Sequence, residues 1–526
     1  MTATLFVGGD VLAPSAPDAT ALLVRDRTIA WVGAAAGADV QRFEADEVVE
    51  LHDALVTPAF VDAHVHTTAA GLALTGLDLA GTQSLGETLD RVAAAARANR
   101  GAVLLGHGWD ETAWPERRPP TRQELDRASF GAVVYLSRID VHSCVASSAL
   151  LAAVPEAADA PGFDPDGWLR QESHHPVRAA AFEAVTPGQA ADARRALRHH
   201  AASLGIGSFH ELGGPDINGA DDFAAVLRQG RDEPGPTILG YWGVLAGPDL
   251  DGIAQARSMG ARGAAGDLFV DGAIGSRTAH LCAPYADADT CGAQYLTTEQ
   301  IRDHVVACTR AGLQAGFHVI GDAATRCVVD GLEQAAALVG VDAMRAARHR
   351  LEHIELPGAT GIEVMARLGV YASVQPLFDA LWGGPSGMYA ERLGPERAGR
   401  LNPLGTMLHA GVALALGSDA PVTAMGPWSA IQAATHHHVP EHRLSVDQAF
   451  QAHTRGGWRA AGDDVAGVIA VGAPATFAVW DTDHPAGHRG LPDVTPGVRL
   501  PTCLRTVVEG QTVYSQQGNR HEEVNR

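Results

Sequence analysis

Apolar residues recur along this chain in two rhythms. Near both ends, short apolar and β-branched runs are separated by Gly, Pro and Asp, which is typical of strands joined by turns. In the middle, strand-like runs alternate with Ala-rich stretches of helical period, such as Ala190–Leu204 and Ala323–Leu338, which indicates βα units on a parallel sheet. The pattern therefore predicts an α/β fold, a (β/α)₈ TIM barrel, with a composite β-sandwich domain built from both termini.

The predicted domain boundaries follow from these two textures. Residues 1–57 and 465–526 form the composite β-domain, in which Glu509 and Gly510 make a hairpin turn, and residues 58–464 form the barrel. A ninth strand-like run, Ala132–Leu136, lies in a long segment that has to be structured or functional, so 80–190 is predicted to be an inserted lid subdomain. The eight predicted barrel strands are Leu55–Asp62, Ile206–His210, Thr237–Trp242, Leu268–Asp271, Gln314–His318, Arg350–Ile354, Val370–Val374 and Val412–Leu416.

Composition and charge narrow the function. The net charge of −22 argues against nucleic acid and anionic membranes as partners, since a phosphate footprint needs a basic face. There is no apolar run long enough to span a bilayer and no visible secretory signal, and the six scattered cysteines are typical of reduced thiols. We expect a cytoplasmic protein whose partner is a small molecule, with a homodimer possible. All 39 basic residues are arginine, so no lysine is available for Schiff-base chemistry or carboxylation.

Several metal-ligating residue types follow predicted barrel strands. His64 and His66 close the apolar run that starts at Val56, and alternate side chains of an extended segment point to the same side. His318, His353 and Asp419 come at the ends of later strands, where a barrel presents its catalytic groups. Three or four imidazoles with a carboxylate and an open water position match a divalent ion such as zinc, with iron and manganese as alternatives.

Longer motifs give a specific resemblance. The sequence resembles the amidohydrolase superfamily, and within it amidohydrolase family 3, the branch that contains N-substituted formamide deformylases. The resemblance implies the composite β-domain, a metal site at residues 64, 66, 318, 353 and 419, and hydrolysis of a carbon–nitrogen bond other than a peptide bond. The motifs that carry it are ALVTPAFVDAHVH at 54–66, GWDETAWPE at 108–116, RPPTR at 118–122, DGAIGSRTA at 271–279, HVIGD at 318–322, LEH at 351–353 and GSDAP at 417–421.

One position departs from the family's pattern. Many relatives carry a lysine four residues before the Asp-Gly pair that here opens at Asp271, and its carboxylated form bridges two metals. This chain has Asp267 there. An aspartate is several bonds shorter than a carboxylated lysine, so we expect one tightly held ion rather than a bridged pair. Asp267 is a weaker ligand candidate, and a role without any ligation is equally compatible with the sequence.

The expected chemistry is attack by metal-activated water. Asp419 would take the proton of this water and pass it to the leaving nitrogen, and His353 would ligate the ion or polarise the carbonyl. Substrate contacts are predicted for five residues: Arg277, His142, His210, Trp109 and Trp114.

Two other functions stay open. A deaminase with a mononuclear metal site is compatible with a chain that has no lysine. Deaminases of this superfamily usually carry a glutamate shortly after the fifth-strand histidine, whereas here His318 is followed by Val-Ile-Gly-Asp. A non-catalytic regulatory or ligand-binding relative is the other alternative, and the complete set of imidazoles with Asp419 argues against it.

Overall fold

The computed structural model describes residues 2–111, 114–138, 143–170, 173–215, 217–482 and 490–516. The chain forms two compact units. The main unit comprises Met1–His66 and Arg198–Arg526, and the inserted unit comprises Thr67–Leu197. None of the helices in the described ranges combines the length and the apolarity that crossing a bilayer requires.

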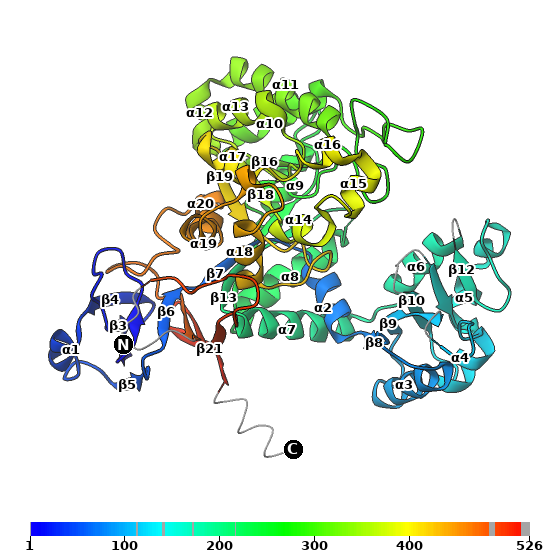
Figure 1. Cartoon of the computed structure of the whole chain (residues 1–526), viewed down its shortest axis with the longest axis horizontal. Coiled ribbons are helices and arrows are strands. Elements are labelled where there is room, and N and C mark those ends of the chain that lie inside the picture. Colours follow the sequence, from blue (N-terminus) through cyan, green and yellow to red (C-terminus); the bar gives the residue numbers. More distant parts are fainter. Residues whose placement is uncertain are drawn as a thin grey trace. The chain divides into compact units, whose positions relative to one another are not determined.

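An eight-stranded parallel sheet in the main unit closes into a barrel (Figure 1). Its order runs from β19 through β18, β17, β16, β15, β14 and β13 to β7, and a parallel bridge between Val65 and Ala420 joins the first strand to the segment after the last. The fold is therefore the TIM barrel that the sequence predicts. The barrel strands are β7 (Phe60–Val65), β13 (Ile206–Gly213), β14 (Thr237–Trp242), β15 (Gly263–Ala264), β16 (Gln314–Val319), β17 (Arg350–His353), β18 (Tyr371–Val374) and β19 (Ala413–Leu416).

Helices cover the outside of this barrel. Their ends follow local signals: Thr297 caps α10 through a capping box with Gln300, and left-handed Gly312 ends it. The helices of the main unit are α8 (Gly219–Asp232), α9 (Asp251–Ser258), α10 (Thr298–Ala311), α11 (Asp322–Val339), α12 (Val341–Ala347), α13 (Gly358–Leu368), α14 (Pro376–Trp382), α15 (Met388–Leu393), α16 (Pro395–Ala398), α17 (Leu404–His409), α18 (Pro427–Thr435), α19 (Val446–Ala452) and α20 (Arg455–Ala460), and α7 (Pro187–Ser203) runs from the inserted unit into the main unit.

Two predicted barrel strands need correction. The run Leu55–Asp62 is split: Leu55–Pro58 (β6) pairs with β20 in the terminal sheet, and only β7 enters the barrel. The fourth strand is Gly263–Ala264, which pairs with Tyr241 and Gln314, whereas Leu268–Asp271 contributes a single bridge from Phe269. A Gly-Ala pair carries no β-branched signal, so only its neighbours in the sheet make it a strand.

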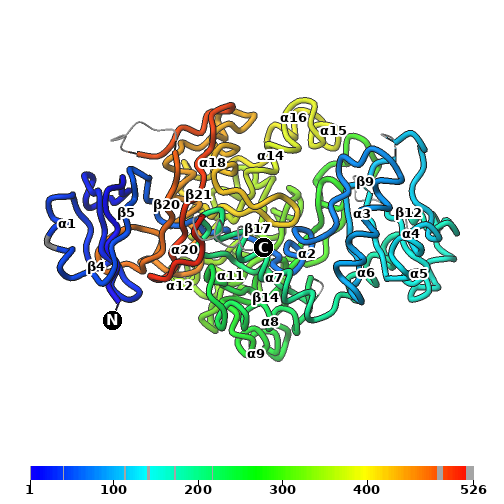
Figure 2. Tube along the Cα trace, turned by 90° about the horizontal axis from the view of Figure 1, so that it is seen from below, coloured from blue at the N-terminus to red at the C-terminus, as the bar shows by residue number. Residues whose placement is uncertain are grey.

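Both termini contribute to a β-sandwich. The two sheets have the orders β4-β3-β1-β5 and β2-β6-β20-β21-β22, and Figure 2 shows the C-terminal strands beside the N-terminal ones. Phe6 of one sheet meets Phe477 of the other edge-to-face at 5.1 Å in their shared core. Glu509 and Gly510, both with positive φ, form the predicted hairpin turn. The strands are β1 (Ala3–Val7), β2 (Asp10–Val11), β3 (Ala21–Arg25), β4 (Thr28–Gly33), β5 (Glu47–Glu50), β6 (Leu55–Pro58), β20 (Phe477–Asp481), β21 (Thr502–Val508) and β22 (Gln511–Ser515).

The inserted unit has a five-stranded sheet of its own, with the order β12-β11-β10-β9-β8. The ninth predicted strand, Ala132–Leu136, corresponds to β10 in this sheet. Its elements are α2 (Thr67–Thr75), β8 (Leu77–Asp78), α3 (Leu85–Ala98), β9 (Leu104–Trp109), α4 (Arg122–Ala128), β10 (Val134–Arg138), β11 (Ser143–Ala146), α5 (Ser148–Ala153), β12 (Trp168–Arg170) and α6 (His174–Glu183).

Candidate metal centre

Polar side chains gather where the barrel strands end. His64 and His66 lie at the end of β7, and His353 is the last residue of β17. Asp419 follows β19, and Asp267 follows the two-residue strand β15. The carboxyl ends of parallel strands share one rim of a barrel, which is why residues more than 300 positions apart in the sequence meet here.

Two carboxylates lie between the two histidines of β7. The Oδ2 atom of Asp267 is 3.3 Å from Nε2 of His64 and 3.1 Å from Nε2 of His66. The Oδ1 atom of Asp419 is 3.4 Å and 3.2 Å from the same two nitrogens. Four ligand atoms at tetrahedral corners about 2.0–2.1 Å from one ion stand about 3.3 Å apart. The nitrogen–oxygen separations are those of neighbouring ligands on a small cation.

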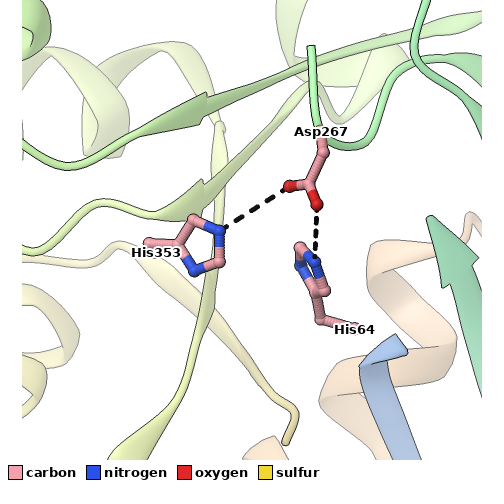
Figure 3. Close-up of side chains that lie close together, drawn as sticks. All are labelled: His64, Asp267 and His353. Carbon is pink, nitrogen blue, oxygen red and sulfur yellow. Dashed lines mark ion pairs between the residues drawn. The ribbon is translucent and has the colours of Figure 1, made fainter. Parts of the chain in front are cut away.

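His353 approaches the cluster from the other side of Asp267. Its Nε2 atom is 3.7 Å from Oδ1 of Asp267, so the two oxygens of this carboxylate face different imidazoles (Figure 3). Two overlapping groups of possible ligands result, namely His64 with Asp267 and His353, and His64 with His66 and Asp419. Asp267 thus lies inside the cluster, although the sequence offered it only as a weak candidate.

His318 lies beside this cluster rather than within either group. Its ring meets that of His353 edge-to-face at 4.6 Å, and its Nδ1 atom is 3.8 Å from Oδ1 of Asp271. Burial and the neighbouring His353 lower the pKa of His318 to about 3, so the ring is neutral and its nitrogen lone pair is available.

Each imidazole of the cluster is held through its Nδ1 atom. Nδ1 of His64 is 2.9 Å from Oε2 of Glu352, Nδ1 of His66 is 2.9 Å from the Leu212 carbonyl oxygen, and Nδ1 of His353 is 2.9 Å from Oε1 of Gln375. Each of these oxygens accepts a hydrogen bond from Nδ1–H, which leaves Nε2 as the atom that faces the cluster. Sequence reasoning missed all three partners, and only the LEH motif drew attention to Glu352.

The electrostatics of the cluster favour a cation. Burial lowers the pKa of His64, but Asp267 and Asp419 outweigh it and raise the pKa to about 10. The pKa of His66 is raised well above its usual value by the same two carboxylates, against the effect of burial. Nε2 of His64 and Oδ1 of Asp267 are buried and have no hydrogen-bond partner among the described residues. Buried polar atoms without partners are costly, and a metal ion bound between the β7 histidines would satisfy Nε2 of His64.

The backbone is strained at the same place. His353 has a φ of 66° and Asp419 has a φ of 57°, both in the left-handed region that residues other than glycine rarely adopt. The peptide N–H of Asp419 donates to the His64 carbonyl oxygen at 2.8 Å, which ties the loop after β19 to β7. Backbone strain of this kind clusters at functional sites, where the surrounding structure enforces it.

Four of the predicted substrate contacts are engaged elsewhere. Arg277 is paired with Asp287 at 2.7 Å, which makes it a brace of its own loop. His210 is wholly buried in the barrel, with Nδ1 accepting from Arg350 at 2.9 Å.

Trp109 and Trp114 also need correction, because both are fully buried in the core of the inserted unit. Their indole N–H groups donate to the carbonyl oxygens of Leu136 and Thr82, at 2.8 Å each. His142 lies outside the described residues.

Comparison with known proteins identifies the family. A model described as the amidohydrolase family matches residues 47–514. The chain belongs to the amidohydrolase family. Membership of this family makes the chain a hydrolase. The matched residues include the terminal sandwich strand β20, the barrel and the inserted unit.

Individual relatives of this amidohydrolase have low sequence identity to it but align with it over most of their length. It is 29% identical to Protein LONG AFTER FAR-RED 3 of Arabidopsis thaliana, over 95% of this chain and 89% of the relative. It is 25% identical to N-substituted formamide deformylase of Arthrobacter pascens, over 95% and 96%. A solved structure titled as an uncharacterized metal-dependent hydrolase from Pyrococcus furiosus superposes with a TM-score of 0.75 at 24% identity, over 91% of this chain and 99% of that one. The likeness to this structure supports the fold.

Proposed function

We propose that this amidohydrolase binds one divalent metal ion and uses it to hydrolyse an amide-type carbon–nitrogen bond of a small molecule. The single observation that carries the proposal is the donor set around the two β7 histidines: each of their Nε2 atoms lies 3.1–3.4 Å from one oxygen of Asp267 and one oxygen of Asp419. Nitrogen and oxygen donors at this spacing suit zinc, which is the ion we favour.

The residues that would hold the ion are His64, His66, Asp267 and Asp419. The approach of His353 to Oδ1 of Asp267 supports it as a further ligand or as a hydrogen-bond donor to substrate. His318, whose neutral ring lies against His353, supports that side of the site. The short reach of an aspartate supports one ion here in place of the pair that a carboxylated lysine bridges.

The ion, when bound, lowers the pKa of a water molecule toward 7 and so supplies a nucleophile at neutral pH. Asp419 has one carboxylate oxygen directed at the histidines, and its role is to hold this water and take its proton. The same carboxyl group then delivers the proton to the nitrogen that leaves. His353, oriented by Gln375, holds the substrate's carbonyl oxygen as an imidazolium, because, against the effect of burial, Asp267 raises the pKa of the ring and Nε2 then carries a proton of its own.

The substrate we propose carries a neutral amide, with N-substituted formamides as the first candidates because a relative over nearly the whole chain is named for them. An apolar wall lies next to the site. The ring of Phe378 stacks on that of His353 at 5.9 Å, and Trp382 contacts Phe378 at 4.9 Å. Such a wall favours an aromatic or aliphatic group on the amide.

The test is a hydrolysis panel with zinc-reconstituted protein. N-benzylformamide, larger amides, cyclic amides and carbamates are compared, with ammonia release from purines and pyrimidines as the readout for deamination. We expect chelator-sensitive hydrolysis of at least one amide-type compound. Absence of turnover throughout, from a protein that binds zinc, would overturn the catalytic proposal and favour a ligand-binding role.

A further inference from the structure

A buried arginine and glutamate lie on the inward face of β17, below the candidate metal centre. Arg350 and Glu352 are two residues apart on one strand, so their side chains point to the same face. Both are fully buried. A buried ion pair is expensive to desolvate and is weak evidence for stability by itself, so its retention calls for another reason.

The pair forms a two-pronged contact. Nε of Arg350 donates to Oε1 of Glu352 at 2.5 Å, and Nη2 donates to Oε2 at 3.0 Å. This fork places the guanidinium charge of Arg350 directly against the buried carboxylate of Glu352, so the two side chains fix each other's orientation.

Arg350 is itself anchored to several strands. Its Nη2 atom donates to the carbonyl oxygen of Ala63 on β7 at 2.7 Å and to Oγ of Ser373 on β18 at 3.0 Å. Its Nη1 atom donates to Nδ1 of His210 on β13, and the guanidinium lies over the ring of Tyr241 on β14, 4.5 Å from the centroid. The position of Glu352 is thus set by contacts with strands all around the barrel.

Glu352 contacts one histidine of the candidate metal centre, His64. Its Oε2 atom accepts a hydrogen bond from Nδ1–H of His64, with 2.9 Å between the oxygen and the nitrogen. The Nδ1 atoms of His66 and His353 bond to neutral acceptors, the Leu212 carbonyl and the Gln375 amide. Among these three histidines, His64 alone bonds through Nδ1 to a carboxylate. His64 is also the residue shared by both groups of possible ligands.

We propose that Glu352 is the positioning residue of the metal centre, held by Arg350 so that its carboxylate keeps His64 in the tautomer and orientation that present Nε2 to the ion. The inference rests on the proposed function. Glu352 does not touch substrate or the ion, and acts through His64. Partners of this kind contribute about 10- to 100-fold to metal affinity.

The test measures zinc affinity by chelator competition, with no substrate. Glu352→Asp keeps the charge that Arg350 needs but is one methylene shorter, so it loses contact with His64. Glu352→Gln removes the charge, and the double variant Arg350→Gln with Glu352→Gln removes both charges in case the single variant does not fold. The matched control is Glu355→Gln, which alters a buried glutamate three residues away that contacts Asn402 instead of a ligand.

We expect Glu352→Asp and the double variant to bind zinc about 10- to 100-fold more weakly, and Glu355→Gln to bind as the wild type does. The visible spectrum of the cobalt-substituted protein should change in Glu352→Asp and stay unchanged in Glu355→Gln. Wild-type affinity in a folded Glu352→Asp protein, or an equal loss in Glu355→Gln, would overturn the positioning role. A wild-type protein that binds no zinc would instead overturn the proposed function itself.

Discussion

Asp267 directs both of its carboxylate oxygens at histidines of the cluster, and replacing it gives the sharpest test of the centre. Asp267→Ala removes the oxygen that lies 3.3 Å and 3.1 Å from the two β7 histidines, and also the oxygen that faces His353. Zinc sites with four protein ligands bind with about 10–16 kcal/mol, or about 2.5–4 kcal/mol per ligand. At 1.4 kcal/mol per tenfold, loss of one ligand weakens binding by about 10²- to 10³-fold.

The assay is competition with a chromophoric chelator, together with metal content after dialysis. Asp379→Asn is the matched control, because Asp379 is another buried carboxylate of the barrel but bonds to His438 and not to the cluster. We expect wild-type zinc affinity in Asp379→Asn and a deep loss in Asp267→Ala. If Asp267→Ala folds and binds zinc within threefold of the wild type, Asp267 is not a ligand. A firm two equivalents of metal per wild-type chain would contradict the single-ion proposal.

Three further outcomes follow from the structure. Asp419→Asn should reduce turnover by at least about 10²- to 10⁴-fold with an unchanged melting curve, since it removes the proposed base; retained activity would refute that role. Burial lowers the pKa of His304 to about 4 from about 6.5, so the ring is neutral in the folded protein. The free energy of unfolding that depends on this neutral ring is fully present above about pH 6.5 and is lost as the pH falls toward about 4. The loss is about 2 kcal/mol at pH 5. The melting temperature of His304→Gln should accordingly fall less between pH 7 and pH 5 than that of the wild type, and parallel curves would count against it. Trp114→Phe, which loses the hydrogen bond to Thr82, should speed proteolysis within the inserted unit by destabilising it about 1 kcal/mol and leave zinc affinity unchanged; weaker zinc binding would contradict its role as a core residue.

Much of this protein can be read from local patterns. Seven of the eight predicted barrel strands overlap an observed barrel strand, because buried parallel strands are short apolar runs between helices of clear period. His64, His66, His353 and Asp419 were chosen as candidates for a related reason. A polar residue at the end of an apolar strand is conspicuous, and the barrel topology states where such ends meet.

Other features depend on partners that lie far away in the sequence. Gly263–Ala264 is a strand only because β14 and β16 flank it, and the sequence gives no reason to divide 55–62 between two sheets. Trp109 and Trp114 have the composition of a pocket wall, but their indole N–H groups find carbonyls within the inserted unit. Residue type indicates what the side chains of Trp109 and Trp114 can contact, and tertiary packing determines where they lie.

The chain by itself determined the barrel, the terminal sandwich and the kinds of ligand available, because these depend on hydrophobic period and on residue type. Only the tertiary structure decided that Asp267 joins the cluster, that His318 lies beside it, and that Glu352 supports His64. Contacts of 3–4 Å between strands depend on how the barrel closes, and sequence spacing carries no information about distances across its interior.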